Sequence, residues 1–327
     1  MHSKQLNEVR QEPVRPKGEA LRATVILARD GKTPADSVKA PAPDFPLPEV
    51  GTVLGRYRLL AWSGVGSAGV VFRGLHMALD VPVAVKILYR DRYPDRLAAT
   101  EHLRTEAFLL ARITHPHIVR LWDFHDDPEL PYLVTEYVPG PTLGEVIRKE
   151  GKLEPHQAVR VVMQAADALG AVWRFGAIHR DLKPDNLILG PEAGVKLIDF
   201  GLAKIVAEES RPAPIAATVA EWAGTPAYLA PEQSRFGALV DHRADIYSLG
   251  VTFYEALTGR LPFRGKTAAQ MILRHREETP LPPSVFNPAI GSDLSKVVLR
   301  MLAKNPAQRF DSSESLRAAL RAAAAKL

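Results

Sequence analysis

The apolar pattern of this chain changes from strand-like to helix-like at about residue 139. Before that point, short runs rich in β-branched residues, as at 70–73 and 83–87, are separated by glycines, which is typical of antiparallel hairpins. After it, apolar residues recur at helical spacing. The clearest stripe consists of Ala158, Val162, Ala165, Leu169 and Val172. A sheet-rich part followed by a larger helical part predicts an α+β fold of two lobes with a cleft between them.

Further strands are predicted at 57–60, 121–124 and 132–137, and a helix at about 94–113 interrupts them. Residues 245–257 are apolar almost all round, which predicts a helix buried in the middle of a domain. We therefore expect a small lobe over residues 51–138, an antiparallel sheet with one helix. A larger helical lobe is expected over 139–327.

Residues 1–50 differ from the rest of the chain. They contain seven of the 27 prolines and no helical stripe, and 40–48 is typical of an extended polyproline-type linker. The apolar patch at 25–28 is too short to form a core alone. We predict that this segment is disordered, or at most docked on the folded part.

Composition excludes several classes of protein. The net charge of +5 comes without a dense basic run, so nucleic acid is not an expected partner. Cysteine is absent, which removes disulfides and thiol catalysis and fits a reducing compartment. No signal peptide and no apolar stretch of membrane-spanning length is found. We expect a soluble, cytoplasmic protein.

A glycine-rich segment lies between two of the predicted strands. Gly64, Gly66, Gly69 and Val71 fit the form G-x-G-x-x-G-x-V, which lets the backbone pass close over phosphates. Similar spacing also marks dinucleotide-binding folds and ordinary turns. A strand follows this segment, whereas a dinucleotide-binding loop opens a helix, and this favours a phosphate-covering loop.

Two charged residues lie near this segment in otherwise apolar patterns. At period two, Ala84 and Lys86 share one face of a strand. Glu106 lies in the helical stripe of Ala99, Leu103, Leu110 and Ile113, whereas the nearby Glu101 falls off it. A buried carboxylate needs a partner. The alternative for Lys86 is an ordinary lysine that reaches solvent from a strand edge.

Residues 179–186 carry the densest polar motif of the chain. Asp181, Lys183, Asp185 and Asn186 lie within eight residues, in an order that no packing face would select. Asp199 follows in the motif Asp-Phe-Gly. The spacing of Asp181 and Asn186 is that of a proton-accepting carboxylate and a metal-binding amide in phosphoryl transfer.

Together these motifs resemble the protein kinase family, in order, over about residues 57–319. Within the family, the chain most resembles the bacterial, eukaryotic-like serine/threonine kinases, and Lys183 is typical of the serine/threonine class. The resemblance implies phosphoryl transfer from ATP to Ser or Thr hydroxyls of proteins, including the chain itself, with a transient homodimer possible. By this resemblance, Asp181 accepts the hydroxyl proton and Lys183 neutralises charge on the moving phosphoryl group. Asn186 and Asp199 hold Mg²⁺. Lys86 pairs with Glu106, and His179 packs as a scaffold residue.

The resemblance also places the ATP pocket. Val71 and Ala84 are expected above the base and Ile188 below it, with backbone groups of Glu136 and Val138 at its edge. The small Thr135 just before that edge would leave a back pocket open. His115 and His117 would join a helix to a strand; a metal site there would lack further ligands.

Residues 224–232 resemble the segment that supports the peptide substrate, with Thr225 beside the acceptor hydroxyl. Arg309 would pair with Glu232, and Asp245 would hold the catalytic loop. Arg180 before Asp181 implies control by phosphorylation between 202 and 229, at Thr218 first and Ser210 second, with Arg180 and Lys204 as the cations that order the phosphate. Thr218 as an ordinary loop residue remains the alternative.

Two other functions compete with this interpretation. A pseudokinase usually lacks the lysine or one of the two aspartates, and Lys86, Asp181 and Asp199 are all present. A small-molecule phosphotransferase of similar fold would lack the peptide-supporting segment. The physiological substrate and the activating signal cannot be predicted from these motifs.

Overall fold

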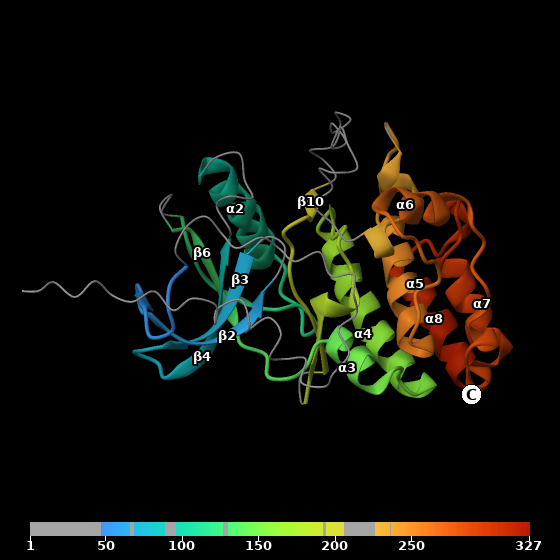
Figure 1. Cartoon of the computed structure of the whole chain (residues 1–327), viewed down its shortest axis with the longest axis horizontal. Helices are drawn as coiled ribbons and strands as arrows, with labels where there is room; N and C mark the ends of the chain where they lie inside the picture. Colours follow the sequence, from blue (N-terminus) through green and yellow to red (C-terminus); the bar gives the residue numbers. More distant parts are fainter. Residues whose placement is uncertain are drawn as a thin grey trace, which may run out of the picture.

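A computed structural model of the chain describes residues 47–65, 69–88, 96–126, 130–191, 194–205, 226–235 and 237–327. Most of the segment for which we predicted disorder, residues 1–46, lies outside the described residues, as do Gly66, Ser210, Thr218 and Thr225. Figure 1 shows the sheet strands and α2 at one end of the molecule and the helices α3 to α8 at the other. The predicted two-lobed α+β fold is confirmed.

The N-terminal lobe is built on a six-stranded antiparallel sheet of order β1-β2-β3-β4-β6-β5. The strands are β1 (Val53–Leu54), β2 (Tyr57–Val65), β3 (Gly69–His76), β4 (Val81–Leu88), β5 (Leu121–His125) and β6 (Tyr132–Glu136). β2 is longer than predicted, because it continues through Gly64 into the glycine-rich segment, and β6 ends one residue earlier than predicted.

Alternation along β4 separates a packed face from an open face of this sheet. Val83, Val85 and Ile87 are buried in one apolar cluster, whereas Ala84 and Lys86 are only partly buried. This is the arrangement predicted from period two. Helix α2 (Arg96–Arg112) contacts β5 and β6, and Leu103, Glu106 and Leu110 of its predicted stripe are buried.

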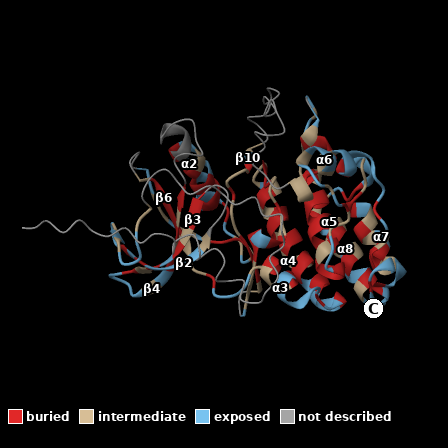
Figure 2. Ribbon diagram, viewed as in Figure 1, coloured by how far each residue is buried: buried red, intermediate tan, exposed pale blue. Residues whose placement is uncertain are grey.

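The C-terminal lobe surrounds two central helices. α4 (Pro155–Arg174) and α5 (Arg243–Thr258) pack against each other, and α5 is buried almost all round, as predicted for 245–257 and as Figure 2 shows in red. All five residues of the predicted stripe on α4 are buried. The other helices are α3 (Leu143–Glu150), α6 (Ala268–Glu277), α7 (Gly291–Met301) and α8 (Ser313–Ala324).

Short strands at the start of the C-terminal lobe carry the predicted catalytic motifs. β7 (Ala177–Ile178) pairs with β10 (Lys204–Ile205), and β8 (Leu187–Gly190) pairs with β9 (Gly194–Leu197). Isolated bridges from Ile118 to Leu197 and from Thr142 to Ile188 connect these strands to the segments that flank β5 and β6. The motifs therefore lie where the two lobes meet.

Candidate active site

Lys86 on β4 forms ion pairs with two carboxylates. Its Nζ lies 2.7 Å from Glu106 Oε2 on α2 and 2.7 Å from Asp199 Oδ1, which follows β9. The other oxygen of the buried Glu106 accepts the backbone N–H of Phe200 at 3.2 Å. The predicted pairing of Lys86 with Glu106 is confirmed, while the exposed Glu101 pairs with Arg104.

The charges in this cluster shift one another. Burial disfavours the Lys86 ammonium, but Asp199 and Glu106 together raise its pKa above the usual value. Burial also acts against ionised Asp199, yet the Lys86 ammonium lowers the pKa of that carboxyl. For Glu106, burial is the largest effect and raises the pKa. One ammonium thus serves two carboxylates, and the cluster carries an excess of negative charge.

Close strand packing sets the position of Lys86. A Cβ atom added at Gly69 would lie 2.2 Å from the Ile87 carbonyl oxygen, so only glycine allows β3 to approach β4 this closely. The pairing that results puts Val71 directly opposite Lys86. Gly64 pairs with Val71 from the other side, and among the described residues beyond its chain neighbours none comes within 4 Å of a Cβ built there.

The loop that carries Asp181 is held by its backbone. Asp245 on α5 accepts the N–H groups of His179 and Arg180, both at 2.9 Å. Arg180 has a φ of +69° and Asp199 a φ of +64°, a conformation that L-residues seldom adopt and that clusters at functional sites. Asp245 thus holds the loop that carries Asp181, as predicted, and the fully buried His179 packs edge-on to Phe200.

Three predicted side chains meet within this loop. Lys183 Nζ lies 2.5 Å from Asp181 Oδ2, and Asn186 Nδ2 donates to the Asp181 carbonyl at 2.8 Å. Both carboxylate and ammonium are mostly shielded, with 13% and 19% of their side chains exposed. The loop therefore presents a carboxylate whose charge is matched by a neighbouring ammonium.

Asn186 and Asp199 offer oxygen ligands of the kind that Mg²⁺ prefers. The Asn186 amide nitrogen is turned to the loop, which directs its oxygen away from it, and the Asn186 carbonyl accepts the N–H of Ile198, next to Asp199, at 3.0 Å. In the part of the chain that the structure describes, no group of three His, Cys, Asp or Glu residues could hold a metal alone. An amide and a carboxylate that leave further positions to nucleotide phosphates and water fit a Mg²⁺ ion.

The residues predicted to line a nucleotide pocket lie on the open face of the sheet and on β8. Val71, Ala84 and Thr135 are partly buried, and Thr135 stands directly opposite Ala84 on β6. Ile188 on β8 is also partly buried and bridges to Thr142. Val138 is buried just beyond the end of β6.

The side chain of Glu136 forms a contact that the motifs did not predict. Its Oε1 lies 2.7 Å from Nζ of the buried Lys196 on β9 and accepts the Arg120 backbone N–H at 2.9 Å. Lys196 also donates to the Ile118 carbonyl. The only signal in the sequence was a lysine inside the apolar strand 195–198. This pair ties the edge of the predicted pocket to the strand that leads to Asp199.

A second buried ion pair lies far from the nucleotide face. Arg309 binds Glu232 through two nitrogens, at 2.5 and 2.8 Å, as predicted. Arg309 also donates to the carbonyls of Arg243 and Ala303, both at 2.8 Å. The pair joins residues 231–234 to the C-terminal helices.

The predicted regulatory cations lie near each other. Burial and the charge of Arg180 both lower the pKa of Lys204 on β10. Their candidate partners Thr218 and Ser210 lie outside the described residues, as does Thr225. The rings of His115 and His117 lie 5.6 Å apart with their planes tilted, and His117 Nδ1 bonds to the Val195 carbonyl, so this loop is tied to β9.

The family model described as protein kinase domain matches residues 57–320. The chain belongs to the protein kinase family. The two carboxylates on one lysine, the Asp181 loop and the Arg309–Glu232 pair therefore belong to a kinase domain.

Individual relatives are similar over most of this kinase domain. Serine/threonine-protein kinase PknB of Mycobacterium leprae is 39% identical over 269 residues, which cover 81% of this chain and 42% of that protein. Serine/threonine-protein kinase Pkn1 of Myxococcus xanthus is 39% identical over 293 residues, covering 88% of this chain and 41% of that protein. The chain spans less than half the length of these relatives.

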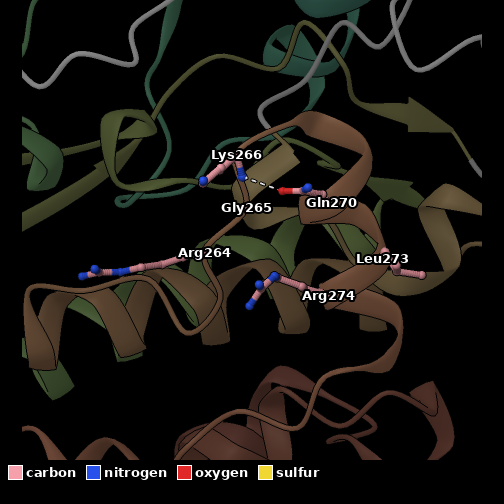
Figure 3. Close-up of a pocket in the computed structure, with 6 residues that line it drawn as sticks. All are labelled: Arg264, Gly265, Lys266, Gln270, Leu273 and Arg274. Atoms are coloured by element: carbon pink, nitrogen blue, oxygen red, sulfur yellow. Dashed lines mark hydrogen bonds between the residues drawn. The ribbon is translucent and has the colours of Figure 1, made fainter.

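A separate hollow lies beside α6 in the C-terminal lobe. Its lining includes none of the predicted site residues, and it is basic. Figure 3 shows the residues that line it, which are Arg264, Gly265, Lys266, Gln270, Leu273 and Arg274. Within this lining, the Lys266 backbone N–H donates to Gln270 Oε1 at 3.0 Å. Among the described residues, no helix is long and apolar enough to cross a membrane.

Proposed function

We propose that this chain is an ATP-dependent protein serine/threonine kinase that phosphorylates Ser and Thr hydroxyls of proteins, including its own. The observation that carries the proposal is the shared ammonium of Lys86, with Glu106 and Asp199 both at 2.7 Å. This pairing aligns the sheet, α2 and the Asp-Phe-Gly segment in one place. The two relatives named above are both serine/threonine-protein kinases, which supports the choice of acceptor.

The loop residues provide the groups that the transfer needs. The acceptor oxygen attacks the γ-phosphorus of ATP, the bond to the β-phosphate oxygen breaks, and the hydroxyl proton passes to Asp181. Lys183, already 2.5 Å from Asp181, offsets negative charge on the moving group. Mg²⁺ held by Asn186 and Asp199 would neutralise phosphate charge.

ATP is proposed to bind on the open face of the sheet. Val71 and Ala84 would cover the base and Ile188 would lie beneath it. Backbone groups of Glu136 and Val138 would bind its edge. The pair between Glu136 and Lys196 supports this placement, because it fixes the end of β6 against β9.

Control by phosphorylation is part of the proposal. A phosphate on Thr218, or on Ser210 as second choice, would be ordered by Arg180 and Lys204. A transient homodimer would allow transfer between two copies, and Thr225 would lie beside the acceptor hydroxyl. Mass spectrometry of active protein tests the sites: fully active protein with an unmodified Thr218 would exclude that switch.

The direct test of the function is transfer of labelled phosphate. The protein would be incubated with γ-labelled ATP and MgCl₂, with and without a generic acceptor protein, and the labelled amino acids would be identified after hydrolysis. We expect phosphoserine and phosphothreonine in both samples, and none with the Asp181→Asn variant. Label that stays in ATP with the unaltered protein would reject kinase activity.

A further inference from the structure

His275 is the only buried residue of α6 (Ala268–Glu277), all of which the structure describes. His275 is 1% exposed, whereas all the other residues of this helix are exposed or partly exposed. Helices usually pack through apolar side chains. If the buried position of this helix served packing alone, an apolar side chain would be expected there. The histidine instead puts two hydrogen-bonding nitrogens at that position.

Both ring nitrogens of His275 have partners from other elements. Nε2 lies 2.9 Å from the Ala227 carbonyl oxygen, and Nδ1 lies 2.9 Å from the hydroxyl of Tyr247 on α5. A carbonyl oxygen only accepts, so Nε2 carries the hydrogen. In the neutral ring, Nδ1 then accepts from the Tyr247 O–H. The two hydrogen bonds thus link Tyr247, His275 and the Ala227 carbonyl in series, with Tyr247 as the first donor and Ala227 as the last acceptor.

The surroundings keep this ring neutral. Burial, and then the charge of Lys304, lower the pKa of His275 to about 4. Lys304 donates to the His275 backbone carbonyl at 2.7 Å and lies over the ring of Phe263, which itself packs edge-on to His275. A neutral ring with its hydrogen on Nε2 satisfies both hydrogen bonds.

Ala227 belongs to the segment that resembles a peptide support. The turn Pro226–Tyr228 is bound from α5 as well, since Ser248 Oγ donates to the Tyr228 carbonyl at 2.8 Å. Tyr228 in turn donates to Glu255 at 2.6 Å. Tyr247 and Ser248 are neighbours on α5, so one helix reaches the turn both directly and through His275.

We propose that His275 is a positioning residue for the protein substrate: its Nε2–H fixes the Ala227 carbonyl, so that residues 226–228 present a preformed surface to the acceptor segment. The proposal rests on the proposed kinase function and extends it to how the acceptor is held. His275 touches neither nucleotide nor the reacting atoms. Its loss should therefore affect use of the acceptor and spare reactions that need none.

Two substitutions of similar polarity separate positioning from packing. The amide nitrogen of His275→Gln lies near the position of Nε2 and can donate to Ala227. The shorter amide of His275→Asn lies near Nδ1, where it can meet Tyr247 but cannot reach Ala227. Both variants would be assayed for KM and kcat with a Ser-containing acceptor peptide, for ATP hydrolysis without peptide, and for Tm. His275→Leu provides the level for complete loss.

We expect His275→Asn and His275→Leu to raise the KM for the peptide about tenfold, as for an unpartnered buried carbonyl. His275→Gln should stay within about threefold of the unaltered protein, and ATP hydrolysis should change less than twofold in all three. Equal peptide KM values for Asn and Gln, or a loss of ATP hydrolysis that matches the loss with peptide, would overturn the proposal.

A second measurement observes the ring directly in the unaltered protein. Nitrogen-15 NMR of histidine-labelled protein, with His275→Gln used to assign the signal, should show a neutral ring protonated at Nε2. A ring protonated at Nδ1 overturns the proposal. If the unaltered protein transfers phosphate to no acceptor, the proposed function fails instead, and the ring state still decides whether His275 holds Ala227.

Discussion

Among the described residues, the ion-pair sites at Arg309 and at Lys86 both join distant segments, and they differ in charge balance and in access. Arg309 faces one carboxylate, that of Glu232, and the two side chains are 0% and 7% exposed. Lys86 faces two carboxylates, and one of them, Asp199, has 39% of its side chain exposed. Arg309 also donates to backbone carbonyls, whereas the lysine has an excess of negative charge around it.

This difference separates a structural pair from a functional one. A buried pair whose charges cancel and whose donors are all bound has nothing left with which to bind a ligand. A cluster with net negative charge and an exposed oxygen can attract a cation, and perturbed groups of this type gather at active sites. We therefore expect changes at Lys86 and Asp199 to affect turnover and changes at Arg309 and Glu232 to affect stability.

The largest expected effect is at Asp199. Asp199→Asn keeps the shape but removes the charge that would hold a metal ion at the phosphates, so kcat should fall by about a thousandfold or more. The free energy of unfolding should not fall, because the variant leaves Lys86 paired one-to-one with Glu106. Initial rates and urea denaturation measure the two quantities.

The same cluster predicts the response to metal removal. Excess EDTA should abolish turnover of the unaltered protein, and added MgCl₂ should restore it, while Asp199→Asn should remain inactive at any MgCl₂ concentration tested. Asp199→Asn with unaltered turnover would contradict the metal assignment. A loss of stability similar to that of an Arg309 variant would erase the distinction between the two ion pairs.

At the balanced pair, the expected effect is on stability. Arg309→Met leaves the buried Glu232 carboxylate without its partner, which should cost about 3–5 kcal/mol of unfolding free energy. Urea denaturation measures it, with Arg300→Met, a change at an arginine stacked on Phe310, as the control. The KM for ATP of the remaining folded protein should be unchanged. A raised KM with unaltered stability would be the opposite of what the comparison implies.

The site was predictable from sequence where its signals are local. The parity of Ala84 and Lys86 and the carboxylate within the α2 stripe follow from strand and helix periods. The resemblance to protein kinases then implied the pairing of Lys86 with Glu106, 20 residues apart. The remaining contacts depend on how the lobes meet. Lys86 and Asp199 are 113 residues apart and Glu136 and Lys196 are 60 apart, and no local period relates them.

The fold shows the same limit in its boundaries and in α6. Buried α5 was predicted because its apolar residues leave no exposed face, but β2 was predicted too short, since glycines normally end a strand and here pairing with β3 carries it through Gly64. His275 had no signal at all. Its importance arises from Tyr247 and Ala227, which lie 28 and 48 residues away.

His275 is a buried polar group that is neutral, and its pH response sharpens the comparison. Its pKa is lowered from 6.5 to about 4, so between these values the unfolded chain binds a proton that the folded chain does not. Stability is therefore lost as the pH falls from about 6.5 to 4, by roughly 3 kcal/mol at most. The glutamine of His275→Gln does not bind a proton in this pH range, so this variant lacks the effect.

Thermal or urea unfolding at pH 7 and pH 4 measures this contribution. The stability advantage of the unaltered protein over His275→Gln should shrink by that amount at the lower pH. Contributions from the other titrating groups cancel in this stability difference, because both proteins share those groups. A difference that stays constant from pH 7 to pH 4 would mean that the ring is charged, or exposed, in the folded protein.

The smallest expected effect tests whether the space beside Lys86 is the one used by a nucleotide. Thr135 stands opposite Ala84, and its hydroxyl donates to the Glu136 carbonyl at 3.3 Å. Thr135→Met extends a side chain behind the proposed base position, so bulky ATP-competitive inhibitors should lose at least about tenfold in affinity, while the KM for ATP should change less than threefold. Thr135→Val, which removes the hydroxyl but keeps the volume, should leave both unchanged. Inhibitor Kd values and ATP kinetics of the three proteins are the measurement. Thr135→Met could instead weaken the binding of ATP and of inhibitors equally. In that case the open face beside Lys86, unlike the sealed Arg309 pair, would not be divided into a base site and a back pocket, and the placement of the nucleotide would be wrong.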